Sequence, residues 1–232
     1  MKPLPMIFFE SVLKRIFIVL LTAVMLISVL NFTLREKKLD ETKHEITFVE
    51  KKVQDVQNFL AVDKARTMSL KKIKRIIFKY NKQMACNIQN KIANEIYNMS
   101  VMYTNLDINL ICATITHETA RTWRPDVVSP AGAMGLMQIM PYTGYFLSKL
   151  EGFRWTNAKE VLFDPVKNIQ MGCRYLSMLV EMYHVDGGLA AYNGGESRAA
   201  KWLASGRNDN ALFEETRSYV PAVLHLYNGY KN

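Results

Sequence analysis

Cysteine and histidine are scarce in this 232-residue chain, and neither is spaced as in a metal site. The three cysteines, Cys86, Cys112 and Cys173, are too few for a disulfide framework and leave room for one bridge at most. Cys112 and Cys173 fall in apolar helical patterns, where a buried and inert thiol is usual. The four histidines show no metal-ligand spacing. We therefore expect no metal site. We also expect no other cofactor.

Net charge is absent from the C-terminal part of the chain. Residues 85–232 hold 13 lysines and arginines against 13 acidic residues, whereas residues 1–84 hold 17 against eight and carry the whole excess of +9. A basic segment beside a membrane is attracted to anionic headgroups, although a solvated stalk explains the same excess. We do not expect nucleic-acid binding, because no zinc spacing, recognition helix or interleaving of basic and aromatic residues supports it.

No charged residue lies between Arg15 and Arg35. As a helix, this apolar run spans roughly 28 Å, close to the thickness of the hydrocarbon layer of a bilayer. The run is long for a signal peptide, and no small-x-small cleavage site follows it. We predict a retained membrane anchor over residues 1–35, with its transmembrane helix at residues 16–34. A cleaved signal peptide is the alternative.

Proline and glycine are both missing from residues 36–84, which are charged and helix-prone. We predict a helical stalk over this range. Apolar residues from Ile46 to Leu60 form a seam of about two heptads, which fits a short coiled coil or an amphipathic helix lying on the domain or on a partner. A second apolar stripe, from Leu70 to Ile77, runs among lysines and arginines and fits either a membrane surface or ordinary helix packing.

Strand-like alternation and internal repeats are absent from residues 85–232, so we predict a mainly α-helical domain. Helix-start signals, an N-cap acid or a proline for the first turn, occur at Asp107, Pro141 and Asp164-Pro165. The glycine pair Gly187-Gly188 is expected to break the chain. Pro221 either kinks the last helix or occupies its first turn.

Four short motifs follow one another in this domain. They are Glu118-Thr119; Ser129-Pro130-Ala131-Gly132-Ala133-Met134-Gly135-Leu136-Met137-Gln138-Ile139-Met140-Pro141; Ala191-Tyr192-Asn193-Gly194-Gly195; and Glu215-Thr216-Arg217-Ser218-Tyr219-Val220. In this order they resemble the catalytic domain of the soluble lytic transglycosylase family, a branch of the lysozyme-like superfamily. The resemblance covers roughly residues 85–230 and implies a lysozyme-like helical catalytic domain over residues 85–232.

The resemblance implies an enzyme that cleaves the β-1,4 bond between N-acetylmuramic acid and N-acetylglucosamine in peptidoglycan. Members of the family use no water, because the muramic acid closes on itself to a 1,6-anhydro ring. The catalytic glutamate of the family maps onto Glu118. Its substrate-binding residues map onto Ser129, Met137, Gln138, Tyr192, Asn193, Glu215 and Tyr219.

A single acid suits this chemistry. Most glycosidases place two carboxylates around the scissile bond, but only Glu118 occupies an acid position in the matched loop, and Asp126 has no counterpart in the family pattern. Glu118 would protonate the leaving oxygen and then accept the proton of the C6 hydroxyl that attacks C1. It must therefore be protonated near neutral pH, and burial against Met134, Leu136 and Met137 would raise its pKa.

The chain departs from the family pattern around the acid. Thr119 stands where the family usually has serine, and Trp123 and Ser129 each come two residues late, which leaves their contacts open. Tyr192 is placed to hydrogen-bond either Glu118 or the N-acetyl group of the substrate.

The remaining motif residues allow two roles each. Glu215 is expected to be a structural acid buried against the site rather than a catalyst. Asn193 fits a turn cap or a sugar contact, and Tyr219 fits packing or a sugar contact. His117 adjoins Glu118, but neighbours on a helix point about 100° apart, so we interpret it as non-catalytic.

This function places the catalytic domain in the periplasm, facing the cell wall, on a single-pass protein of the cytoplasmic (inner) membrane. The expected partners are the glycan strands of peptidoglycan, the membrane and, by analogy alone, an envelope-spanning machine such as a secretion apparatus, pilus or phage. Two alternatives remain. A hydrolytic lysozyme on the same fold would use water, and a wall-binding scaffold would not cleave the wall.

Overall fold

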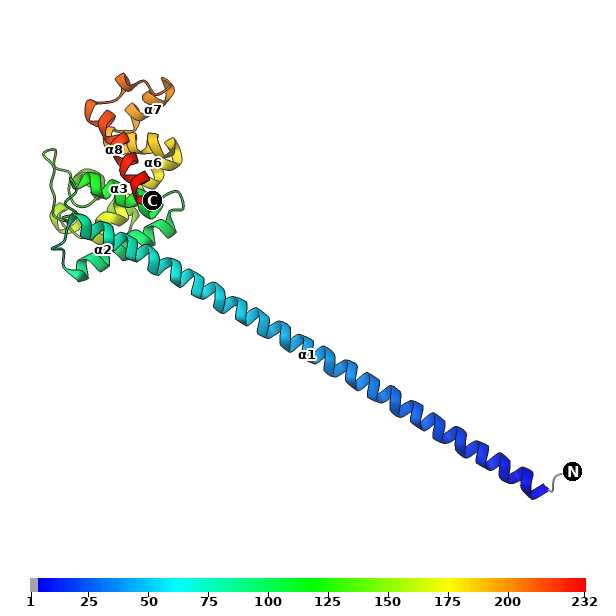
Figure 1. Cartoon of the computed structure of the whole chain (residues 1–232). Coiled ribbons are helices and arrows are strands. Elements are labelled where there is room, and N and C mark those ends of the chain that lie inside the picture. The colour runs from blue at the N-terminus through cyan, green and yellow to red at the C-terminus, as the bar shows by residue number, and fades with distance from the viewer. Residues whose placement is uncertain (1–3) are drawn as a thin grey trace. The chain divides into compact units, whose positions relative to one another are not determined.

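The computed structural model describes residues 4–232, with side chains from Phe8 onward, and consists of helices and connecting loops (Figure 1). Along the chain the helices are α1 (Leu4–Tyr80), α2 (Cys86–Met102), α3 (Ile108–Glu118), α4 (Pro141–Leu150), α5 (Ala158–Leu162), α6 (Pro165–Gly194), α7 (Glu196–Ala204), the 3₁₀ helix η1 (Asp209–Ala211) and α8 (Glu214–Lys231). Residues 4–232 contain no β-strand, and two isolated bridges pair Met134 with Val128 and with Ile139. The prediction of a mainly α-helical protein is confirmed.

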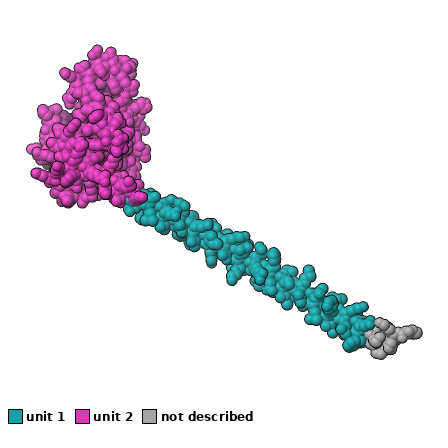
Figure 2. All heavy atoms as spheres, in the orientation of Figure 1, with its two compact units in different colours: residues 1–63 teal, residues 64–232 magenta. Residues whose placement is uncertain are grey.

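The chain divides into two compact units, residues 1–63 and residues 64–232 (Figure 2). In the first unit, α1 exposes every side chain that is described. Part of this helix has a mean hydropathy of 2.5, and it is long and apolar enough to cross a membrane. A signal sequence near an N-terminus has the same properties, so the retained anchor stays a prediction. The division into anchor, stalk and catalytic domain also stays a prediction.

The end of α1 belongs to the second unit and buries one side in its core. Ile73 and Ile77 are fully buried. The side-chain amide of Gln89, on α2, donates a hydrogen bond to the carbonyl of Lys74 at 3.3 Å, which joins the two helices. Of the two alternatives for this apolar stripe, ordinary helix packing is therefore the correct one.

Helices of the second unit begin where local signals predict. Asp107 and Asp164 are N-caps, and each carboxylate accepts hydrogen bonds from two backbone amides at the start of its helix. Pro141 and Pro165 occupy the first positions of α4 and α6. These features were predictable because capping depends on neighbours in the chain.

The expected break at Gly187 and Gly188 is wrong, and one of the two alternatives for Pro221 is excluded. Helix α6 continues through Gly187 and Gly188, and its kink lies at His184, which has a φ of 62°. A Cβ at Gly188 would lie 2.9 Å from the backbone of Val180, so this glycine permits close packing instead of ending the helix. Pro221 lies inside α8, which begins at Glu214, so the first-turn alternative is excluded.

The middle of α3 is enclosed by the rest of the second unit. Every residue from Leu110 to Thr116 is buried. The helix packs against α8 and α2, and Figure 1 shows α8 beside it. Burial of one leucine or isoleucine side chain contributes about 1.5–3 kcal/mol, so α3 is firmly anchored. Its last residue, Glu118, therefore has a fixed position.

Candidate active site

Glu118 ends α3, and the chain turns sharply after it. Ala120, Arg121 and Trp123 all have positive φ angles, of 47°, 64° and 53°. The hydroxyl of Thr119 donates to the carbonyl of Ile115 at 2.8 Å and accepts from the backbone N–H of Trp123 at 3.1 Å. The threonine that replaces the usual serine thus uses its hydroxyl to hold the turn that follows the acid.

Trp123 is a core residue below this turn. Its side chain is fully buried, and its indole N–H donates to the hydroxyl oxygen of Thr116 at 3.0 Å. The same hydroxyl donates to the carbonyl of Cys112 at 2.7 Å and lies 3.0 Å from the hydroxyl of Tyr230. Trp123, which comes two residues later than in the family pattern, is therefore part of a buried polar network. Sequence reasoning missed Thr116 and Tyr230 as members of this network.

Tyr219 donates a hydrogen bond to the carboxylate of Glu118, with 2.6 Å between Oη and Oε1. The two residues are 101 positions apart and meet because α8 packs on α3. Tyr219 is 2% exposed, and burial raises the pKa of its hydroxyl, which therefore keeps its proton and acts as the donor. The ring of His117 meets that of Tyr219 edge to face, with 4.7 Å between the ring centroids.

Burial raises the pKa of Glu118 from its usual 4.5 to about 7. The hydrogen bond from Tyr219 favours the ionised form and opposes this rise, while the negative charge of Glu215 adds to it. At neutral pH both protonation states of Glu118 are populated. Such a carboxyl group can donate a proton and take one back within a single reaction.

The loop that carries the Gly-Leu-Met-Gln motif is held by its own polar groups. The hydroxyl oxygen of Ser129 accepts from the backbone N–H of Ala133 at 3.0 Å. The side-chain amide of Gln138 donates to the carbonyls of Gly135 and Val127 at 2.7 and 3.2 Å. In this structure Ser129 and Gln138 therefore shape the loop, and their predicted contacts with sugar stay predictions.

A buried asparagine, which sequence reasoning missed, fixes this loop to α6. The amide oxygen of Asn168 accepts from the backbone N–H of Met137 at 2.8 Å, and its amide group donates to the carbonyls of Met134 and Leu162 at 3.0 and 2.9 Å. A Cβ at Gly135 would lie 2.2 Å from the Asn168 amide, so only glycine fits there. The sequence offered one signal for this role, because Asn168 directly precedes Ile169 in the apolar stripe of α6.

The side chain of Tyr192 contacts the backbone of Met137. The hydroxyl of Tyr192 donates to the carbonyl of Met137 at 2.7 Å, not to Glu118, so one of the two expected contacts of Tyr192 is wrong. The Met137 side chain is fully buried, and its sulfur lies 3.8 Å from that of Cys173. Sugar contacts of both residues stay predictions. Cys86, Cys112 and Cys173 are all free thiols.

Asn193 and Glu215 form a second pair. The Asn193 amide donates to Glu215 at 3.3 Å and accepts from the hydroxyl of Thr216 at 2.7 Å. Glu215 is exposed, so the expectation of a buried structural acid is wrong, because the first turn of α8 lies at the surface. In the described part of the chain, no group of three or more His, Cys, Asp or Glu side chains is arranged to hold a metal ion.

Comparison with known proteins identifies relatives of the second unit. The family model described as "Transglycosylase SLT domain" matches residues 96–212. The chain is 38% identical over 118 residues to the soluble lytic murein transglycosylase of Escherichia coli K12. This match covers 47% of this chain and 18% of that protein. The chain is also 32% identical over 120 residues to the membrane-bound lytic murein transglycosylase C of Histophilus somni strain 2336. This match covers 47% of this chain and 32% of that protein.

A solved structure resembles the same region. It is the X-ray structure of an inactive mutant of the lytic transglycosylase Slt from Pseudomonas aeruginosa. The TM-score is 0.52 at 29% sequence identity, and the match covers 59% of this chain and 23% of that one. The chain thus spans only about a fifth to a third of the length of these relatives.

Proposed function

Because this chain belongs to the family of transglycosylase SLT domains, we propose that it is a peptidoglycan lytic transglycosylase. It cleaves the β-1,4 bond between N-acetylmuramic acid and N-acetylglucosamine and leaves a 1,6-anhydromuramoyl end. The relatives named as lytic murein transglycosylases support this activity. The observation that carries the proposal within this chain is the pKa of Glu118, raised to about 7 by burial.

In the first step Glu118 acts as the acid. Its protonated carboxyl group gives a proton to the glycosidic oxygen while the bond from that oxygen to C1 of the muramic acid breaks. N-acetylglucosamine leaves with a free hydroxyl group, and positive charge develops on the muramic acid ring. The raised pKa supports this step, because an ordinary glutamate is ionised at neutral pH and has no proton to give.

In the second step Glu118 acts as the base. The C6 hydroxyl of the same muramic acid attacks C1, and its proton passes to the carboxylate. A bond forms between C1 and the C6 oxygen, and Glu118 regains the proton that it gave. The hydrogen bond from Tyr219, at 2.6 Å, stabilises the carboxylate between the two steps and fixes its direction.

The other carboxylates near the motif support a mechanism with one acid. Asp126 is exposed and forms an ion pair with Arg124 at 2.8 Å. Glu215 is exposed and accepts from the Asn193 amide. The hydrogen bonds from Arg124 lower the pKa of Asp126, whereas burial raises the pKa of Glu118.

Mass spectrometry of digested peptidoglycan tests the reaction. We expect products with 1,6-anhydromuramoyl ends from the wild-type chain and no clearing of a peptidoglycan zymogram by Glu118→Gln. Products one water molecule heavier per end would assign the chain as a hydrolytic lysozyme. Clearing by Glu118→Gln would refute the assignment of the acid, and no clearing by the folded wild-type chain would favour a wall-binding scaffold.

We also propose that residues 16–34 anchor the chain as a single span in the cytoplasmic (inner) membrane, with the catalytic domain facing the wall. The exposed apolar part of α1 supports this location, as does the membrane-bound form named for one relative. Protease protection of the catalytic domain in intact cells, lost when the outer membrane is opened, tests the orientation. The association with an envelope-spanning machine stays a prediction.

A further inference from the structure

The part of α1 that belongs to the second unit has basic but no acidic residues. Between Lys64 and Met84 the chain has eight lysines and arginines and no acidic residue. Because Ile73 and Ile77 turn into the core, the opposite side of α1 faces solvent. Its exposed basic residues are Lys64, Lys71, Arg75 and Lys79. Within residues 4–232 none of these four forms an ion pair, so their charge is available to a partner.

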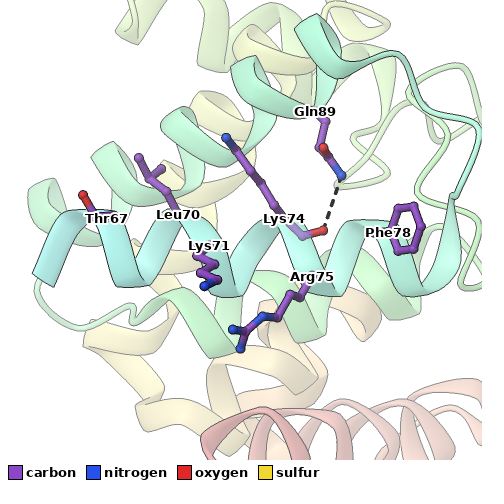
Figure 3. Close-up of a pocket in the computed structure, with 7 residues that line it drawn as sticks. All are labelled: Thr67, Leu70, Lys71, Lys74, Arg75, Phe78 and Gln89. Carbon is purple, nitrogen blue, oxygen red and sulfur yellow. Dashed lines mark hydrogen bonds between the residues drawn. The ribbon is translucent and has the colours of Figure 1, made fainter. Parts of the chain in front are cut away.

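A groove of about 490 Å³ opens on this face (Figure 3). We call it the basic groove; its lining includes Leu70, Lys71, Lys74, Arg75 and Phe78 of α1 and Gln89 of α2. Figure 3 shows the Gln89 amide bonded to the backbone of Lys74, which fixes the position of α2 beside α1. The volume is within the range of ligand sites, about 300–1,000 Å³. None of the lining residues belongs to the predicted active site.

The lining combines two kinds of group. Lys71, Lys74 and Arg75 supply cationic donors, and an arginine can bind a carboxylate through two parallel hydrogen bonds. Leu70 and Phe78 add apolar surface, and Phe78 is 55% exposed. The basic groove therefore suits an extended ligand that carries carboxylates and small apolar groups.

We propose that the basic groove binds the stem peptides of peptidoglycan, apart from the site of cleavage. This inference rests on the proposed function, which brings the chain to peptidoglycan. Stem peptides are short, bear free carboxylates and contain alanine, so they match both the charge and the apolar surface of the groove. A bilayer is also negatively charged, but a concave groove fits a peptide segment better than a planar array of headgroups. Binding there holds the enzyme on the wall while Glu118 acts on a glycan strand.

Sedimentation with insoluble peptidoglycan tests the proposal. The full chain is used in a mild non-ionic detergent, with Glu118→Gln in every sample so that the wall stays intact. The groove variant is Lys71→Glu with Arg75→Glu. The matched control, Lys159→Glu with Lys201→Glu, makes the same change of charge at exposed positions outside the groove. We expect binding to weaken about tenfold in the groove variant and less than about twofold in the control.

Two further arms identify the ligand. Peptidoglycan stripped of its stem peptides by an amidase should bind the chain with an intact groove as weakly as the groove variant binds whole peptidoglycan. Undiminished binding to the bare strands would overturn the proposal, and so would an equal loss in the groove variant and the control. Mixed micelles containing phosphatidylglycerol should leave wall-bound protein in place. Release by these micelles would assign the groove to lipid and overturn the proposal.

The same double variant in a chain with Glu118 intact separates this proposal from the proposed function. We expect it to cleave soluble glycan fragments without peptides at the wild-type rate and to clear intact wall more slowly. If no form of the chain cleaves glycan but binding still depends on Lys71 and Arg75, the proposed function fails and the basic groove stands. If cleavage of intact wall is unchanged and binding is unchanged, the groove has no such role.

Discussion

Glu118 and Asp126 lie eight residues apart in the chain, and their surroundings are opposite. Glu118 ends a buried helix, and burial raises its pKa to about 7 although Tyr219 donates a hydrogen bond to it. Asp126 lies in the exposed loop beyond, where the hydrogen bonds from Arg124 lower its pKa. Both carboxylates are hydrogen-bonded, so bonding alone does not separate them. Position at the end of a buried helix decides which acid keeps its proton near neutral pH.

The largest expected effect is on cleavage. Glu118→Gln keeps the size of the side chain and removes the group that we propose as both proton donor and base, so we expect the rate of wall cleavage to fall about a thousandfold. Asp126→Asn should change the rate less than about twofold, because an exposed ion pair contributes little. The rate of formation of anhydromuramoyl ends, followed by mass spectrometry, measures both. A comparable loss in Asp126→Asn would mean that a second carboxylate takes part.

The next effect is on stability. Substitution of Glu118 and substitution of Asp126 should change the free energy of unfolding at about pH 8 in opposite directions. The unfolded chain releases the proton of Glu118 near pH 4.5 and the folded protein near pH 7, so the free energy of unfolding falls as pH rises between these values. Glu118→Gln removes this cost. We expect it to raise the free energy of unfolding by on the order of 2 kcal/mol at about pH 8, and to leave it unchanged at about pH 4.

Asp126→Asn is the matched variant for stability. The pKa of Asp126 is lowered in the folded protein, so its contribution is present above its unfolded pKa and is lost as pH falls. We therefore expect a small loss of stability at about pH 8. Urea unfolding followed by tryptophan fluorescence measures both variants. A stabilising effect of the same size in each would contradict the contrast between the two sites.

A smaller effect concerns the pH dependence of cleavage. The hydrogen bond from Tyr219 lowers the pKa of Glu118, so Tyr219→Phe should raise that pKa and move the basic limb of the pH–rate profile to higher pH. The rate at the optimum should fall about tenfold, because the carboxyl group loses a fixed direction. Tyr192→Phe is the control, since its hydroxyl bonds the carbonyl of Met137. A basic limb that moves in both variants would exclude a specific role of Tyr219.

The smallest effect comes from Glu215. Its negative charge raises the pKa of Glu118, so Glu215→Gln should lower that pKa and move the basic limb of the profile to lower pH. The shift should fade at an ionic strength of about 1 M, because salt screens charges across solvent. The neighbouring exposed residue supplies the control, Glu214→Gln. Equal shifts in both variants would indicate a general charge effect on substrate binding.

Local features of the fold could be predicted from the sequence. The caps Asp107 and Asp164 and the start of α4 at Pro141 depend on residues within a few positions of each other. The break expected at Gly187 and Gly188 failed because both glycines are buried, and tertiary packing overrides the usual tendency of glycine to end a helix.

The site could be predicted in part. The motifs indicated Glu118 and Tyr219, but not that one bonds the other. The network of Thr116, Trp123 and Tyr230 was invisible, because Thr116 and Tyr230 are 114 positions apart and neither stands in a motif. Such pairs are set by which helices pack together, and periodicity along one helix does not reveal its partner.

The separation of Glu118 and Tyr219 along the chain has a consequence for synthesis. Until α8 docks on α3, the carboxyl group of Glu118 is hydrated, and we expect it to titrate near its usual 4.5 and to be ionised at neutral pH. Titration of Glu118 by NMR in a chain cut before Glu214 measures this, and a value that stays near 7 would contradict it. We therefore expect a nascent chain that still lacks α8 to carry no competent acid. Because Tyr219 follows Glu118 by 101 positions, we expect the proposed acid to be complete only after α8 has been made and has packed on α3.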